Sequence, residues 1–276
     1  MSIPSQLVRQ ATSGTKYIYV PPPVTTITTA IKPLTLCFIP GYRSEFMTSR
    51  KSHLAYDIAQ QNGYGFIAWD HYPIDGSVQQ WYENSCQLLL EHETKIQNNL
   101  FLICSSMGTW ISLLLARRFP HQIQGIVGIG GGVDFTERWL QQEIPIEHRN
   151  DRSYIWKRPS QYDPSGYYEI PIVSLLDSRP VLLLQQHNND NNSDAPATTT
   201  IAENNIQCPV TLIHGANDLD VPLTHAQELT QTLQAWGNNN VKLDIIQDGD
   251  HRLSRPEDLK HIEQKIISKL SQLMKP

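Results

Sequence analysis

The chain has 276 residues, of which 39% are hydrophobic and 18% are charged, and its net charge is −5 at neutral pH. These values are typical of a soluble globular protein and argue against nucleic-acid binding, because no stripe of Lys and Arg is present to contact phosphates. No apolar run approaches the roughly 18 residues of a transmembrane segment.

The cysteines and the N-terminus bear on where the protein works. Four widely spaced cysteines with no C-x-x-C pair predict reduced thiols rather than a disulfide framework or a zinc site. Residues 1–10 lack the apolar core of a signal peptide, which favours a cytoplasmic location. Nothing in the sequence indicates the oligomeric state.

Strand and helix patterns alternate along most of the chain. Two β-rich runs, 17–20 and 24–30, lie on either side of three prolines and predict an edge hairpin or meander. We expect strands at 34–39, 66–69, 100–103, 126–130, 208–215 and 241–246, and helices at 49–61, from about 77, at 111–119, at 222–236 and after a capping box at 254–257. This alternation predicts one α/β domain, 1–276, with a mostly parallel central sheet covered by helices on both faces.

The alternation is lost between residues 133 and 207. This stretch is rich in aromatic residues and prolines, and we expect it to form a cap inserted over the carboxyl edge of the sheet. Within it, residues 187–200 are dominated by Asn, Asp and Thr, which predicts a flexible polar loop.

A pair of serines stands between the 100–103 strand and the following helix. A serine at such a turn fits the nucleophile elbow of an α/β-hydrolase, where the positions two before and two after the nucleophile must be small. For Ser106 these positions hold Cys104 and Gly108, whereas Ser105 would lie between two bulky residues. Ser106 is therefore the expected nucleophile. The alternative is that both serines only cap the helix.

A nucleophilic hydroxyl needs a base, and that base needs an orienting carboxylate. Asp218 follows the 208–215 strand and His251 follows the 241–246 strand, in the order serine, acid, histidine that α/β-hydrolases use. The rival residues have other expected roles: Asp220 caps a helix, Asp248 and Asp250 form a turn, His214 makes a structural hydrogen bond and His225 is solvated.

The remaining parts of such a site are also available. We expect the backbone N–H groups of Met107 and Tyr42 to form the oxyanion hole, since Gly41 lets the loop after the 34–39 strand approach closely. Trp139 and Trp156 are expected to shape an apolar acyl pocket, unless they only pack the cap. The glycines at 130–132 lack the lysine of a phosphate loop and no metal-ligand spacing is present, so we expect no metal and no cofactor.

Four segments, 40–44, 104–110, 214–222 and 250–252, resemble the family of alpha/beta-hydrolase domain-containing protein 10, and the similarity extends from Leu34 to Leu270. That family comprises mitochondrial palmitoyl-protein thioesterases and acyl-glucuronide esterases with bacterial relatives. The resemblance implies the triad Ser106, Asp218 and His251, a small-molecule or acyl-protein substrate, and a possible mitochondrial location. The chain departs from the family at Cys104, at 69–73 and at 187–200, which bears on the substrate more than on the chemistry.

The sequence therefore predicts a serine hydrolase that cleaves carboxylic esters or thioesters through an acyl-enzyme. The alternative is a non-catalytic protein that keeps the α/β-hydrolase fold to bind a ligand or a partner, with Cys104 at the elbow as a sign of lost activity.

Overall fold

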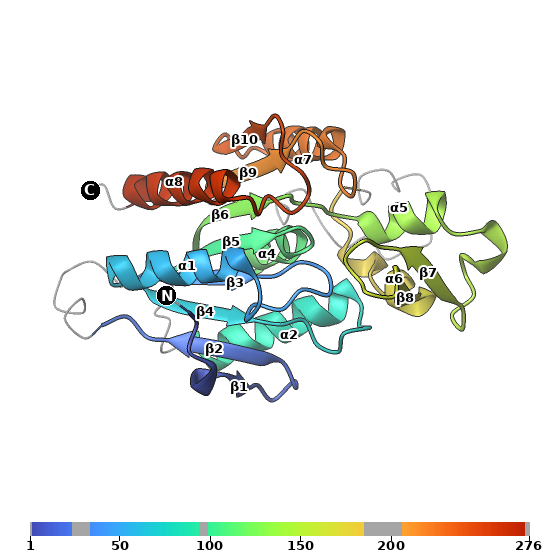
Figure 1. Cartoon of the computed structure of the whole chain (residues 1–276), viewed down its shortest axis with the longest axis horizontal. Coiled ribbons are helices and arrows are strands. Elements are labelled where there is room, and N and C mark those ends of the chain that lie inside the picture. Colours follow the sequence, from blue (N-terminus) through green and yellow to red (C-terminus); the bar gives the residue numbers. More distant parts are fainter. Residues whose placement is uncertain (1, 24–33, 94–98, 185–205, 274–276) are drawn as a thin grey trace.

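An eight-stranded sheet forms the centre of the computed structural model, which describes residues 2–23, 34–93, 99–184 and 206–273 (Figure 1). The strand order is β1-β2-β4-β3-β5-β6-β9-β10. All neighbours from β4 to β10 are parallel, and β1 and β2 join one edge in antiparallel orientation. The strands are β1 (Arg9–Gln10), β2 (Lys16–Val20), β3 (Thr35–Ile39), β4 (Gly65–Trp69), β5 (Leu100–Ser105), β6 (Ile123–Ile129), β9 (Val210–Gly215) and β10 (Val241–Ile246).

The predicted mostly parallel sheet is confirmed, and each predicted strand that lies within the described residues is present. The run 17–20 forms β2, which pairs in antiparallel orientation with β1, a strand that the sequence pattern did not predict; Arg9 lies opposite Tyr17. The other β-rich run, 24–30, lies outside the described residues.

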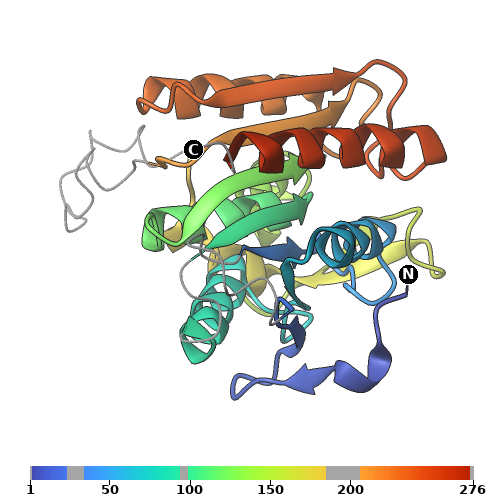
Figure 2. The ribbon, with the colours of Figure 1, turned by 90° about the vertical axis from the view of Figure 1, so that its left-hand side faces the viewer.

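Helices cover both faces of the sheet (Figure 2). The helices α1 (Arg50–Asn62) and α8 (Pro256–Leu273) pack on one face, and α2 (Val78–Glu91), α4 (Gly108–Arg118) and α7 (Leu223–Ala235) pack on the other. Alternate side chains of a strand point to opposite faces of the sheet, and helices cover both faces here. Every residue of β3 is therefore buried. Leu36 and Phe38 contact the α1 and α8 side, whereas Cys37 and Ile39 contact the other side.

Local sequence signals set both ends of α1 and the start of α2, where the Ser77 hydroxyl accepts from the N–H of Gln80. The Ser49 hydroxyl accepts from the N–H of Ser52 at the start of α1, and Gly63 ends that helix with a φ of 68°. The predicted capping box at 254–257 is wrong, because its acidic residue, Glu257, is not the one that accepts from the backbone. The carboxylate of Asp258, one residue later, accepts from the N–H of Arg255 at 3.1 Å.

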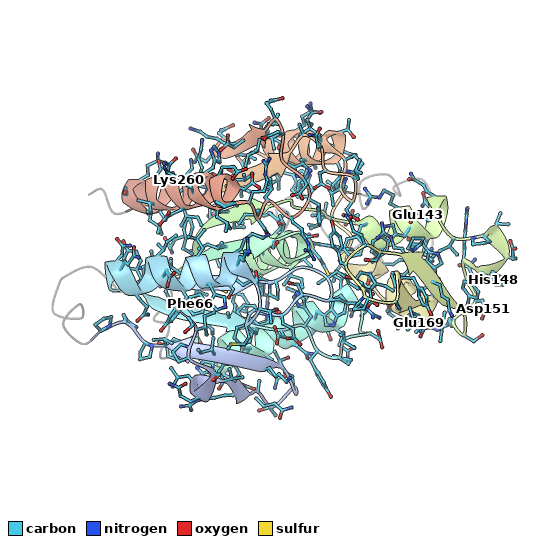
Figure 3. The ribbon with its side chains drawn as sticks, in the orientation of Figure 1. Phe66, Glu143, His148, Asp151, Glu169 and Lys260 are labelled. Atoms are coloured by element: carbon cyan, nitrogen blue, oxygen red, sulfur yellow. The ribbon has the colours of Figure 1, made fainter. Side chains whose placement is uncertain are left out.

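A separate layer lies beyond the carboxyl ends of the parallel strands (Figure 1). It contains α5 (Phe135–Gln142), the 3-10 turns η3 (Ile146–His148) and η4 (Arg179–Val181), the antiparallel pair β7 (Ile155–Pro159) and β8 (Tyr167–Pro171), and α6 (Ile172–Leu176). We call this layer, residues 135–182, the cap. Glu143, His148, Asp151 and Glu169 all lie on it (Figure 3). The division into one domain with a cap at 133–207 stays a prediction, and the predicted polar loop at 187–200 lies outside the described residues.

Candidate active site

Ser106 lies at the turn between β5 and α4, in a backbone conformation that is uncommon for a residue with a side chain. Its φ is 51°, and its N–H donates to the carbonyl oxygen of Ile129 at 2.8 Å. A Cβ atom on Gly108 would lie 2.4 Å from the carbonyl oxygen of Ile39. The turn is therefore as crowded as the nucleophile-elbow pattern requires.

Cys104 occupies the small position on the other side of the turn. Its thiol is fully buried, and Sγ lies 3.4 Å from the carbonyl oxygen of Val127 and 3.7 Å from Oγ1 of Thr109. Burial raises the pKa of Cys104 to about 11. The thiol thus packs among β5, β6 and α4 and makes no contact with the Ser106 hydroxyl.

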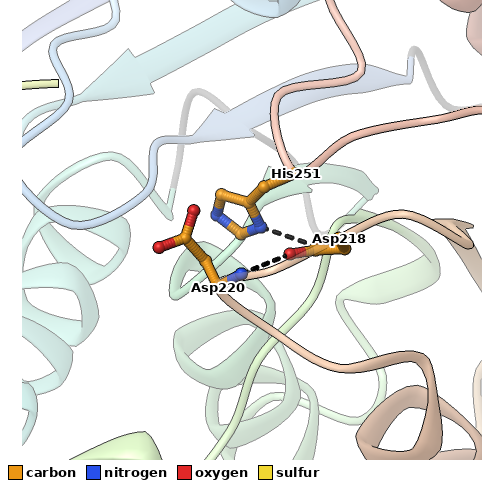
Figure 4. Close-up of side chains that lie close together, drawn as sticks. All are labelled: Asp218, Asp220 and His251. Carbon is orange, nitrogen blue, oxygen red and sulfur yellow. Dashed lines mark hydrogen bonds and ion pairs between the residues drawn. The ribbon is translucent and has the colours of Figure 1, made fainter. Parts of the chain in front are cut away.

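Ser106, His251 and Asp218 come together from three loops at the carboxyl edge of the sheet. Nε2 of His251 is 3.1 Å from Oγ of Ser106. Nδ1 of the same ring is 2.8 Å from Oδ2 of Asp218 (Figure 4). An ionised carboxylate only accepts, so Nδ1 carries the proton and the Nε2 lone pair faces the serine hydroxyl. In this arrangement Nε2 of His251 can take the proton of the Ser106 hydroxyl when that hydroxyl attacks a substrate.

Asp218 is fixed by backbone groups on its other side. Its Oδ1 accepts from the N–H of Asp220 at 2.9 Å and from that of Val221 at 2.8 Å. His214 lies behind it and is fully buried, with Nε2 2.8 Å from the carbonyl oxygen of Val221. This contact confirms the predicted structural hydrogen bond of His214, and burial lowers the pKa of the ring.

Two of the rival residues have roles that the sequence did not predict. Asp220 does not cap α7; instead, its Oδ2 accepts from the hydroxyl of Tyr162 at 2.8 Å. His225 is not solvated, since its Nε2 accepts from the N–H of Val133 at 3.1 Å, and burial lowers its pKa to about 4. The sequence pattern missed both contacts because the partners come from the cap and from the loop leading to it.

Asp218, Asp220 and His251 also have the residue types of a metal site. One ligand atom from each lies within 4.8 Å of the others. Hydrogen bonds already occupy both oxygens of Asp218 and the Nδ1 atom of His251 (Figure 4). A metal ion here would compete for the atoms that orient the imidazole.

Near Ser106, the N–H groups of Met107 and Tyr42 have no acceptor among the described residues. The loop that carries Tyr42 passes directly over the serine, because a Cβ on Gly41 would lie 3.1 Å from Cβ of Ser106. These are the two amides expected for an oxyanion hole.

Residues after β4, in the segment where the chain departs from the family that it resembles, hold this loop in place. Nε2 of His71 lies 2.9 Å from the carbonyl oxygen of Pro40, and Oδ1 of Asp70 accepts from the N–H of Phe46 at 2.8 Å. Burial lowers the pKa of His71 to about 4 and raises that of Asp70 to about 6.

A cleft of about 1020 Å³ lies between the sheet edge and the cap, and Ser106 and His251 line it. Its apolar wall is aromatic. The ring of Tyr42 packs at 5.9–6.3 Å, centroid to centroid, against the rings of Trp81, Phe135, Trp139 and Tyr168. Trp139 therefore lines the cleft, whereas Trp156 packs behind Trp139, 5.7 Å away, and is not part of the lining.

The rest of the cleft is unexpectedly basic for a chain of net charge −5. Among the described residues, the cationic side chains that line it are Lys16, Arg43, Arg50, Lys51, Arg138, Arg158 and Arg252, and the acidic ones are Glu45, Asp70 and Asp220. Some of these cations are neutralised: Arg43 is 2.5 Å from Asp75, and Arg158 is 3.4 Å from Glu143. No sequence pattern indicated this excess, because the residues come from distant segments.

The family follows from a comparison with known proteins. The profile described as "BAAT / Acyl-CoA thioester hydrolase C terminal" matches residues 79–257, which is more than half of the chain. The chain belongs to this family. The match contains the nucleophile elbow and both loops that carry Asp218 and His251.

Similar proteins and solved structures point to the same fold. The mitochondrial palmitoyl-protein thioesterase ABHD10 of rat is 25% identical over 237 residues, covering 81% of this chain and 71% of the relative. The structure of mouse alpha/beta-hydrolase domain-containing protein 10 superimposes with a TM-score of 0.73 at 21% identity, covering 98% of this chain and 97% of the mouse chain. Est1E from Butyrivibrio proteoclasticus superimposes with a TM-score of 0.66 at 13% identity, covering 93% and 95%.

The protein is thus an α/β-hydrolase that resembles ABHD10, and ester or thioester hydrolysis is the activity of its family. No helix within the described residues is long and apolar enough to span a bilayer. The cytoplasmic location stays a prediction.

Proposed function

We propose that this chain is a serine esterase or thioesterase in which Ser106 is the nucleophile, His251 the general base and Asp218 the residue that orients the base. The observation that supports this proposal is the continuous set of contacts at 3.1 and 2.8 Å from Oγ of Ser106 through His251 to Asp218. Its family membership supplies the class of reaction.

The proposed reaction has two halves. Oγ of Ser106 attacks the acyl carbonyl carbon while Nε2 of His251 takes its proton, and the amides of Met107 and Tyr42 donate to the oxygen that becomes negative. His251 then returns the proton to the departing alcohol or thiol. A water molecule attacks the acyl-enzyme by the same route and releases the acid. Asp218 stabilises the imidazolium in both halves.

The cleft supports a small-molecule ester or the acyl group of an acylated protein as substrate, with Trp139 and the ring of Tyr42 against the acyl group. Hydrolysis of p-nitrophenyl esters of increasing acyl length and of palmitoyl-CoA, by the wild type and by Ser106→Ala, tests the proposal. Wild-type turnover that falls by about 10³-fold or more in the variant is the expected result.

A fluorophosphonate probe provides a second readout that needs no substrate. Ser106 of the folded wild type should be labelled, and Ser105→Ala, a neighbouring serine variant, should be labelled equally. Full activity in Ser106→Ala would overturn the choice of nucleophile. A folded wild type that neither reacts with the probe nor cleaves any ester would favour the non-catalytic binding protein.

A further inference from the structure

Arg252 follows His251 directly and lines the cleft, but the proposed reaction gives it no role. Its guanidinium stacks on the ring of Tyr162, 4.4 Å from the centroid, and the Tyr162 hydroxyl is fixed by Asp220 at 2.8 Å. No carboxylate among the described residues lies within ion-pairing distance of Arg252. Stacking fixes the plane of a guanidinium and leaves the N–H donors at its edge available.

Two further cations lie beneath the Arg252 loop, in the first turn of α1. Lys51 donates to the carbonyl oxygen of Arg252 and to Oγ of Ser254, and Arg50 donates to the carbonyl oxygen of Ser254 at 3.0 Å. Lys51 is only 8% exposed, and neither cation has a carboxylate within ion-pairing distance among the described residues. Asp250 and Asp258 are the nearest acidic residues that face Lys51, but both are engaged elsewhere. The carboxylate of Asp250 accepts from the N–H of Leu253, and Asp258 forms an ion pair with Arg255.

Two other cations of the cleft differ from this group because they have carboxylate partners. Arg43 pairs with Asp75, and Arg158 pairs with Glu143. A buried cation without a counter-charge is costly, and an anion bound nearby reduces that cost. Among the described cleft cations without an ion pair, Lys16 lies on β2 and Arg138 on α5, whereas Arg50, Lys51 and Arg252 lie together around the loop after His251.

The proposed reaction decides which part of the substrate meets this charge. His251 must return its proton to the leaving group, so the leaving group lies against the imidazole. Arg252 is the next residue, on the same loop. We propose that Arg252, in the field of Arg50 and Lys51, binds a carboxylate or phosphate carried by the leaving group and makes the enzyme specific for anionic esters or thioesters. This inference rests on the proposed function of Ser106.

The test compares three aryl esters of the one acyl group that the wild type cleaves best. Their leaving groups are 4-hydroxybenzoate, 4-hydroxyphenyl phosphate and the neutral 4-hydroxybenzamide. Values of kcat/KM are measured for wild type, Arg252→Gln, Arg252→Lys and the control Arg118→Gln, which removes one positive charge at the end of α4, outside the cleft.

In Arg252→Gln, kcat/KM should fall about five- to tenfold for at least one of the two anionic esters. It should change less than about twofold for the neutral ester, whose leaving group is 4-hydroxybenzamide. Arg252→Lys should keep part of the preference because it keeps the charge without the planar donors. The wild-type preference should also shrink in 0.5 M salt, while Arg118→Gln should behave as wild type. The anionic ester that responds identifies the group as carboxylate or phosphate.

An unchanged ratio of anionic to neutral turnover in Arg252→Gln would overturn the proposal. An equal loss for all three esters would also overturn it, since Arg252 would then only hold the His251 loop. If Arg252→Gln does not fold, the same ratios in Arg252→Lys and the salt dependence of the wild type decide. Retained activity of Ser106→Ala on these esters would instead show that the proposed function itself is wrong.

Discussion

Oδ2 of Asp218 lies 2.8 Å from Nδ1 of His251, although the two residues are 33 positions apart in the chain. They meet because β9 and β10 are parallel neighbours whose following loops emerge at the same sheet edge. Asp218→Asn should lower kcat on p-nitrophenyl esters by about 10³- to 10⁴-fold, because an amide that donates to Nδ1 selects the wrong imidazole tautomer. Steady-state kinetics with the fold checked by circular dichroism measure this.

The matched control is Asp248→Asn, which changes another aspartate close to the same histidine. Asp248 is exposed and pairs with Arg255 at 2.8 Å, outside the cleft. Its kcat should stay within about twofold of wild type. Equal losses in both variants would mean that Asp218 has no special part in the reaction.

The positions of Ser106, Asp218 and His251 could be predicted because each lies in the loop that follows a strand with a recognisable apolar pattern. In a parallel sheet the carboxyl ends of such strands meet at one edge, so the pattern of strands already determines which loops converge. Gly108 added a local steric requirement that separates Ser106 from Ser105.

The wall of the cleft could not be predicted in the same way. Arg252 and Tyr162 stack on each other from the His251 loop and the cap, and no periodicity relates the two segments. Trp139 and Trp156 are both aromatic residues of the predicted cap, yet Trp156 lies on β7 and packs behind Trp139 instead of lining the cleft. Side-chain contacts between distant segments depend on packing that a single sequence does not display.

The elbow cysteine should contribute to stability and not to catalysis. Cys104→Ala should lower the free energy of unfolding by about 1 kcal/mol, because it removes a buried sulfur from a well-packed site between β5 and α4. Its kcat/KM should stay within about twofold of wild type, since Sγ points to Val127 and Thr109 rather than to Ser106. Urea denaturation and ester kinetics on the same sample measure both, and a large loss of activity in a stable variant would assign the thiol a catalytic part.

All four thiols should resist alkylation in the folded protein at pH 8. Burial raises the pKa of each of them: Cys37, Cys86, Cys104 and Cys208. Only the thiolate reacts readily with iodoacetamide, so mass spectrometry should find the native chain unmodified and the guanidinium-unfolded chain with four labels. Rapid labelling of the native protein at Cys104 would contradict the packing around the elbow.

Removal of divalent metals should leave the activity unchanged. The oxygens of Asp218 accept hydrogen bonds from His251 and from the N–H groups of Asp220 and Val221. These bonds explain why Asp218, Asp220 and His251 lie close together without a metal ion. Dialysis against EDTA should therefore keep kcat/KM within about twofold, and added Zn²⁺ should inhibit by competing for His251. Loss of activity in EDTA that Zn²⁺ restores would replace the serine mechanism with metal-assisted hydrolysis.

Asp70 should make the folded protein less stable as the pH rises from 4 to 6. Burial raises its pKa to about 6 from 3.8, so the folded state favours the protonated acid. The stability from Asp70 is then complete below the unfolded pKa and is lost as the pH rises through the folded one. Asp70→Asn, which keeps an acceptor for the N–H of Phe46, should raise the free energy of unfolding by about 1 kcal/mol at pH 7.5 and leave it nearly unchanged at pH 4.

Asp70→Ala is the matched variant for the hydrogen bond, because it removes both the charge and the acceptor for Phe46. It should be less stable than Asp70→Asn at pH 4 and at pH 7.5, by about 1 kcal/mol. Urea denaturation at four pH values between 4 and 7.5 measures all three proteins. A difference between Asp70→Asn and wild type that stays constant with pH would show that the pKa of Asp70 is the same in the folded and unfolded states, and that burial does not raise it.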